Sequence, residues 1–198
     1  MAERTIVKQV KNAVLYSDGC IRIDNVRASY PHLDEAWANT EKDKPKFSIT
    51  ALGGKDTHGE VKDLCVQEIN RILVEKKLGR IPPKDKFCRN GDDAEKDECD
   101  GQWIFKASET PDKRPTVRKL NNTVATPAET KALIYAGCYV SVLIRPWGQD
   151  NAFGKKVNAN LIAVKFMRDG ERFGEEPISD EDIWDEGGAD NAFDDDSL

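Results

Sequence analysis

The stretch CYVSVLIRPW, from Cys138 to Trp147, decides the fold, because it is the run of this chain richest in strand-forming residues. Apolar and mixed side chains alternate along it, and successive side chains of a β-strand point to opposite faces. One face would carry Val140, Val142 and Ile144, and the other Tyr139, Ser141, Leu143 and Arg145. The pattern predicts a strand with its valine face in the core and its mixed face outward.

Other strand-like runs surround this one at turn-bounded intervals. We predict strands at residues 20–33 (ending at Pro31), 46–52, 102–108, 116–121 and 157–170, with a hairpin-like turn at residues 148–156. Residues 59–79 repeat apolar side chains at three- and four-residue steps and end in Lys76, Lys77 and Gly79, which predicts the one prominent helix. A shorter helical stretch follows Pro127, and residues 80–101 have the composition of a long loop.

Five or six strands with one helix inserted between the second and third of them fit a mainly β fold. The best match is an OB-fold, a five- to six-stranded, partly open Greek-key barrel whose sheet face commonly binds oligonucleotides. We therefore predict an OB-fold domain over residues 1–174 and a disordered acidic tail over residues 175–198.

Charge divides the chain at the same place. Eleven of the 36 acidic residues follow Gly174, where there is no Lys or Arg, so the first 174 residues hold all 30 basic residues against 25 acidic ones. The formal net charge of −6 therefore hides a basic body and an acidic tail. Such a body suits a polyanionic ligand.

Cations and aromatic side chains are interleaved on the predicted strands, as binding of single-stranded nucleic acid requires. An aromatic side chain on a strand is more often in the core than on a binding surface, which favours the core for Phe47, Phe105 and Phe166. Trp147 and Phe153 flank the Gly-rich turn, with Trp147 in the turn itself. The mixed face of residues 139–145 is the expected binding surface. The candidate DNA-binding residues are Lys46, Trp103, Lys106, Arg114, Arg118, Lys119, Tyr139, Arg145, Trp147, Phe153, Lys155, Lys156 and Lys165.

The tail ends in DNAFDDDSL, which sets apolar side chains among acids. A tethered polyanion would compete with nucleic acid for a basic groove at high effective concentration. Once displaced, its end could dock on partner proteins, through Phe193, Asp194, Asp195, Asp196 and Leu198. A tail that serves only solubility is the alternative.

Catalysis and metal binding have little support in the sequence. The five cysteines have no paired spacing and are expected to be reduced and in part buried, and there are only two histidines. The acidic run at residues 91–101 leaves a metal-dependent nuclease as one alternative, although Lys96 would occupy the first ligand position of a calcium loop. A protein-binding DNA mimic is the other. We expect no enzyme activity, no cofactor and no metal.

Several motifs together resemble a family of bacteriophage single-stranded DNA-binding proteins with an OB-fold, long catalogued as a domain of unknown function. They are ASYPHLDE, KFSITAL, GCYVSVLIRPW, DNAFGKKVNANLIAVKFMRDGERFG and the acidic end. The resemblance implies binding of single-stranded DNA during phage replication, recombination or repair, in the cytoplasm of an infected bacterium. It also implies that the tail contacts phage or host replication and recombination proteins. No signal peptide or membrane segment is expected, and a homo-oligomer is left open.

Overall fold

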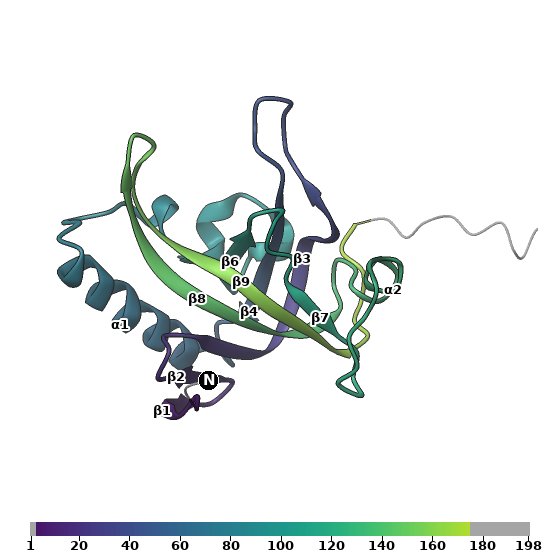
Figure 1. The fold of residues 1–198 in the computed structure, drawn as a ribbon. Helices are drawn as coiled ribbons and strands as arrows, with labels where there is room; N and C mark the ends of the chain where they lie inside the picture. The colour runs from purple at the N-terminus through teal and green to yellow at the C-terminus, as the bar shows by residue number, and fades with distance from the viewer. Residues whose placement is uncertain (1–2, 175–198) are drawn as a thin grey trace, which may run out of the picture.

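The computed structural model describes residues 3–174, drawn in colour in Figure 1. Nine strands and two α-helices make up this part of the chain. In chain order they are β1 (Ile6–Val10), β2 (Ala13–Tyr16), β3 (Ile21–Trp37), β4 (Lys46–Gly54), α1 (Gly59–Glu75), β5 (Cys88–Asn90), β6 (Gln102–Glu109), β7 (Thr116–Arg118), α2 (Pro127–Leu133), β8 (Tyr139–Asn151) and β9 (Gly154–Arg168).

Five strands form a closed barrel. Around the ring β3 pairs with β4, β4 with β6, β6 with β9, β9 with β8, and β8 again with β3. The junction of β6 and β9 is the thinnest, a parallel contact with the single registered pair Ser108 and Asn160. This order, with α1 between the second and third barrel strands, is an OB-fold and confirms the predicted fold class.

The core lies where the alternation of residues 138–147 predicted it. Val140, Val142 and Ile144 are each at most 1 % exposed, and they pair with β3 on one side and β9 on the other. Helix α1 contributes Val61, Leu64, Cys65, Ile69 and Ile72 to the same core. Phe47 and Phe105 are buried and Phe166 packs against the core, as predicted, and all five cysteines are free and buried.

Several predicted strand limits are wrong. Strand β7 ends at Arg118 and not at residue 121, β9 begins at Gly154 and not at residue 157, and β3 and β8 run further than predicted. Strand β3 passes through Pro31 to Trp37, with register shifts on either side of His32 and a left-handed φ of 45° at Tyr30. A bulge is one of the few places where a strand tolerates proline. Strand β8 likewise continues through Trp147 to Asn151, so Trp147 lies in a strand and not in a turn.

Close approach of α1 explains a glycine in the extended part of β8. A Cβ atom at Gly148 would lie 3.0 Å from side-chain atoms of Ile72 and Leu78, so the absence of a side chain lets the helix end lie on the strand. The β8–β9 hairpin therefore rises beside the C-terminal end of α1, as the green arm of Figure 1 shows.

Two of the motifs that carry the family resemblance lie against each other. Gly137 has a φ of 108°, and a side chain there would collide with the backbone of Glu171. Arg27 donates hydrogen bonds to the carbonyl oxygens of both Gly137 and Glu171 and lies over the ring of Phe173. The motifs thus fix the segment that follows β9, and their role is structural.

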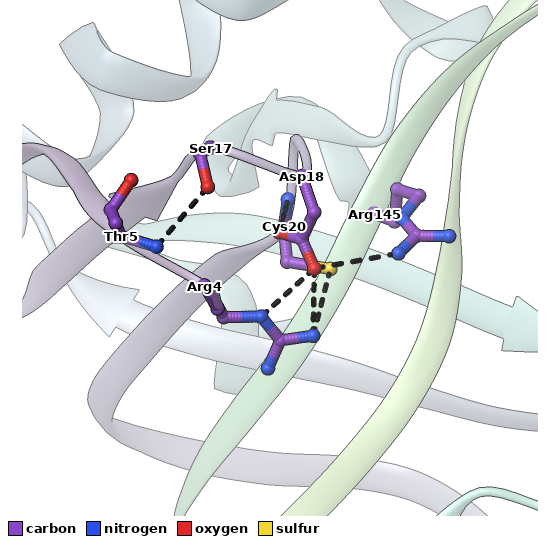
Figure 2. A network of polar contacts seen from close by, with 6 residues as sticks. All are labelled: Arg4, Thr5, Ser17, Asp18, Cys20 and Arg145. Atoms are coloured by element: carbon purple, nitrogen blue, oxygen red, sulfur yellow. Dashed lines mark hydrogen bonds and ion pairs between the residues drawn. The ribbon is translucent and has the colours of Figure 1, made fainter. Parts of the chain in front are cut away.

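The sequence did not predict the N-terminal β1–β2 hairpin, which extends the sheet at β3. Asp18 fastens it to the barrel: its carboxylate lies 2.7 Å from the Arg4 guanidinium and 3.5 Å from that of Arg145, as Figure 2 shows. It also accepts a hydrogen bond from the Cys20 amide at 3.0 Å. Partial burial acts to raise the pKa of Asp18, but the Cys20 amide and Arg4 outweigh it and lower the pKa to about 2.

We expect Asp18→Asn to lower the free energy of unfolding by about 1 kcal/mol at pH 7, since it removes charge-assisted contacts. A carboxyl group with a lowered folded-state pKa stabilises the fold above its unfolded pKa of about 3.9. That contribution disappears as the pH falls toward about 2. Urea unfolding of both proteins across this range measures the difference, with Asp63→Asn on the exposed side of α1 as the control. A difference that stays constant down to pH 2 would contradict the assignment.

Candidate nucleic-acid interface

The barrel places the predicted residues on two different outer surfaces. The first, which we call the β4–β6 face, is formed by β4, β6 and the second half of β3, and it includes the base of the β8–β9 hairpin. The second, the β8 face, is formed by β7, β9, β8 and the first half of β3. In OB-folds, oligonucleotides bind to the second and third barrel strands and to the loops that flank them. Here these are β4 and β6, the loop at residues 38–45 and the β8–β9 hairpin.

Cations converge on the β4–β6 face around Lys106. Its neighbour across the sheet is Thr50 of β4, and its side chain points away from the core. Desolvation of its ammonium group, followed by repulsion from neighbouring cations, lowers the pKa of Lys106. Those neighbours are Arg89, Lys46, Lys96 and Lys156. Five cations from four separate segments therefore share one surface.

Two aromatic side chains beside these cations are half-exposed. Trp37, which is 50 % exposed, is registered with Lys46, and its ring stacks on His32 at a centroid distance of 4.4 Å and an angle of 7°. Tyr30 is 52 % exposed, and the Lys96 ammonium lies 4.1 Å from the centre of its ring. Both rings come from β3 and offer flat surfaces next to positive charge.

The β8–β9 hairpin contributes further rings and cations. Phe153 at its tip is 84 % exposed and Trp147 is 40 % exposed. Lys155 and Lys156 follow the turn on β9, and Lys156 lies 3.8 Å from Asp85. Phe87 joins the base of this hairpin to β6, since its amide donates a hydrogen bond to the carbonyl oxygen of Val157 at 2.9 Å and its carbonyl oxygen accepts one from the Lys106 amide at 2.9 Å.

Two other predicted residues have side chains that neighbouring residues engage, with Trp103 partly buried and Arg114 exposed. Trp103 is partly buried against the core with Lys55 and Lys62 over its ring, and Arg114 covers Phe47 and donates hydrogen bonds to the carbonyl oxygens of Leu33 and Asp34.

The remaining predicted residues lie on or near the β8 face. Arg118 and Lys165 are cross-strand neighbours there, whereas Arg145 pairs with Asp18 and Lys119 with Glu129. The guanidinium groups of Arg27 and Arg168 both lie over the ring of Tyr139, at 5.5 and 3.4 Å from its centre. Tail residues Phe193, Asp194, Asp195, Asp196 and Leu198 lie outside the described residues.

Sequence reasoning missed five residues of the β4–β6 face: Tyr30, His32, Trp37, Arg89 and Lys96. Tyr30 and His32 flank Pro31, which interrupts the alternation of β3, and Trp37 lies beyond it; Arg89 and Lys96 lie in the long segment before β6. Trp37 still carried a signal, since a tryptophan in a polar run has few structural reasons to be there.

His58 does not have the surroundings of a catalytic base. His58 is buried, with its ring nitrogens bonded to Thr57 and to the backbone oxygen of Asp24, and burial lowers its pKa. Within residues 3–174 no three side chains of the metal-ligating kinds come together. Over the same residues no helix is long and apolar enough to cross a membrane.

Comparison with known proteins identifies the family. Residues 20–196 match the family described as Enterobacter phage Enc34, ssDNA-binding protein. The chain belongs to this family. The match confirms the resemblance drawn from the sequence motifs, and it includes most of the residues beyond Gly174.

Individual proteins and solved structures are also similar to this chain over most of its length. Protein p50 of Acyrthosiphon pisum secondary endosymbiont phage 1 is 31 % identical over 162 residues, which are 77 % of this chain and 85 % of that protein. The single-stranded DNA-binding protein of bacteriophage Enc34, solved in complex with single-stranded DNA, is 40 % identical to this chain and has a TM-score of 0.80. That match covers 88 % of this chain and 100 % of the Enc34 chain. A C-terminal truncation of the Enc34 protein matches with a TM-score of 0.79 and 40 % identity over 87 % and 99 % of the two chains.

Proposed function

We propose that this protein binds single-stranded DNA without sequence preference, and that the β4–β6 face is its binding surface. The observation that carries the proposal is the gathering of Tyr30 and Trp37, from β3, with the cations around Lys106, beside the second and third barrel strands β4 and β6. Rings stack on unpaired bases and cations follow the phosphates, so the face supplies both kinds of contact that such binding needs. The solved complex of the Enc34 protein with single-stranded DNA supports the same activity here.

Membership of the family supports a proposal for the biological setting. We propose that the protein acts in the cytoplasm of an infected bacterium, where it protects single strands during phage replication, recombination or repair. Its acidic tail would compete with DNA for the cations of the body and dock on replication or recombination proteins when displaced.

A titration of intrinsic tryptophan fluorescence with oligo-dT tests the binding. We expect quenching, because Trp37 and Trp147 are half-exposed, and an affinity that falls steeply as salt rises. Absence of affinity at low salt would favour the protein-binding DNA mimic. Shortening of the oligonucleotide in the presence of Mg²⁺ would favour the nuclease.

Competition by the tail gives a separate prediction. Replacing Asp194, Asp195 and Asp196 by asparagine should tighten oligo-dT binding at low salt by roughly threefold to tenfold, since it weakens a tethered competitor. The matched control replaces Asp63, Glu75 and Asp112 by their amides, which changes the net charge equally at exposed positions of the body. Equal gains in the two variants would mean that net charge, and not the tail, sets the affinity.

A further inference from the structure

The β8–β9 hairpin projects from a base that is packed against the rest of the molecule. Val157 and its cross-strand partner Gly148 mark this base, because Val157 is buried in the core and the C-terminal end of α1 lies against Gly148. Three further residue pairs, the last of them Asn151 with Gly154, carry the hairpin outward. We call this part, residues 149–156, the hairpin arm. At about 3.4 Å per residue its pairs span about 10 Å, so the turn lies clear of the barrel, as Figure 1 shows.

Side-chain amides stiffen the hairpin arm from its base to its tip. Asn158 donates a hydrogen bond to the Gln149 side chain at 2.8 Å. Gln149 donates in turn to the side-chain oxygen of Asn151 at 3.1 Å and to the carbonyl oxygen of Gly154 at 3.3 Å. The same oxygen of Asn151 accepts a hydrogen bond from the Phe153 amide at 2.9 Å. The backbone that carries Phe153 is therefore held in place before any ligand arrives.

The tip of the arm presents an apolar ring beside positive charge. Phe153 is 84 % exposed, so its ring adds almost nothing to the core. Lys155, two residues further along, is exposed and forms no ion pair with any residue between 3 and 174. A phenyl ring and an ammonium group so close together suit a ligand that offers flat bases and phosphates on one molecule.

The surroundings of the ring indicate which form of DNA it meets. His32 covers one face of Trp37, and the Lys96 ammonium lies over one face of Tyr30. Each of these rings therefore offers a single face to an unpaired base. Phe153 has no aromatic or cationic partner within residues 3–174, and its exposure leaves both faces of the ring open. Such a ring can stack on two bases at once, as do the apolar side chains that proteins insert between base pairs.

The hairpin arm also stands where a duplex would arrive. Its base joins the β4–β6 face through Phe87, which forms hydrogen bonds with both Val157 and Lys106. A single strand that lies on this face and continues along the hairpin brings the duplex from which it emerges to the tip. Unstacking costs least at this place, because a terminal base pair is stacked on one side only.

We propose that the hairpin arm is a wedge that opens duplex DNA at its junction with a single strand. Phe153 enters beside the terminal base pair, Lys155 contacts a phosphate there, and the β4–β6 face holds the released strand. The proposal rests on the proposed binding of single-stranded DNA and adds to it an action on double-stranded DNA. Gln149 is a positioning residue, because it holds the tip without touching the DNA.

Opening of a terminal base pair tests the proposal on the full chain. The probe is a short duplex with an oligo-dT extension on one strand and a fluorescent adenine analogue in the base pair beside it, whose emission rises when it unstacks. With every extension occupied, as judged by anisotropy, the parent protein should raise the emission. Phe153→Ala should lower the equilibrium constant of opening at least about fivefold, the smallest loss expected when a ring no longer stacks on a base.

Three further variants separate a wedge from a stacking platform. Phe153→Leu keeps an apolar side chain that can enter between base pairs, and it should retain most of the opening. Gln149→Ala keeps the ring but releases the tip, so it should lower the opening at an unchanged affinity for oligo-dT. Val74→Ala is the matched control, since it shortens another exposed apolar side chain, outside the hairpin, and should change neither quantity.

Bound parent protein that left the terminal pair closed would overturn the proposal but not the binding of single strands. Equal opening by the parent and by Phe153→Ala would mean that the protein only captures strands that part by themselves. If Phe153→Ala and Phe153→Leu lost as much affinity for oligo-dT as for the junction, the ring would be a platform for an unpaired base. A doubled mass of the parent on the probe, absent for Phe153→Ala, would place the tip against a second copy instead. Absence of affinity for oligo-dT would overturn the proposed function itself.

Discussion

Trp37→Ala should weaken binding of oligo-dT by ~1–3 kcal/mol, which raises Kd about 5- to 150-fold. The indole is half-exposed beside Lys46, and His32 supports one of its faces, so the ring is already held in place before a base arrives. A side chain ordered in advance loses little conformational entropy on binding. The measurement is a fluorescence-anisotropy titration with labelled oligo-dT at fixed salt.

Trp37→Phe is the matched control, because it keeps a flat ring at the same position and should retain most of the affinity. Circular dichroism should show the same barrel in all three proteins, since the side chain lies outside the core. An alanine variant that folds and binds as tightly as the parent would remove Trp37 from the interface.

The second large effect is expected from the cations. Replacing Lys46, Lys106 and Lys156 by glutamine should lower the slope of log K against log salt by about 2, at about 0.7 for each lost phosphate contact on a single strand. The same relation gives a loss of about 100-fold in affinity at 0.1 M salt. The measurement is a series of oligo-dT titrations at salt concentrations from about 0.05 to about 0.3 M. This range includes the interval of about 0.05–0.2 M over which the affinity changes most.

A control for this variant replaces three exposed lysines that lie elsewhere, Lys8 on β1, Lys77 after α1 and Lys131 on α2. It removes the same charge but should change the slope by much less. If both triple variants lose slope equally, the phosphates do not follow the β4–β6 face, and only the overall charge of the body matters.

The sequence predicted the barrel well because the residues that give its clearest patterns alternate or repeat regularly. Residues 139–145 gave the inward and outward faces of β8 correctly, and the three- and four-residue steps of residues 59–79 gave α1. The ends of β3 and β8 were missed for the opposite reason. In β3 two bulges and Pro31 break the alternation, and in β8 pairing with β9 carries the strand through Gly148 into the hairpin.

Prediction of the interface was limited in a different way. Alternation tells which side chains point outward, but it does not tell which outward surfaces meet. Lys106 and Arg118 were chosen on the same grounds, and the closed barrel then places them on different faces. Conversely, Arg89 and Lys96 join Lys106 only because residues 80–101 fold back along β6. That contact depends on tertiary structure and has no local signal.

One feature of the barrel limits how its surfaces can be separated by genetics. Strand β9 pairs with β6 at Asn160 and with β7 at residues 163–165. The same strand therefore borders both the β4–β6 face and the β8 face. A substitution in β9 that shifted its register would disturb both surfaces at once. Substitutions that affect only one of the two surfaces should therefore be sought in β4, which borders only the β4–β6 face, and in β7, which borders only the β8 face.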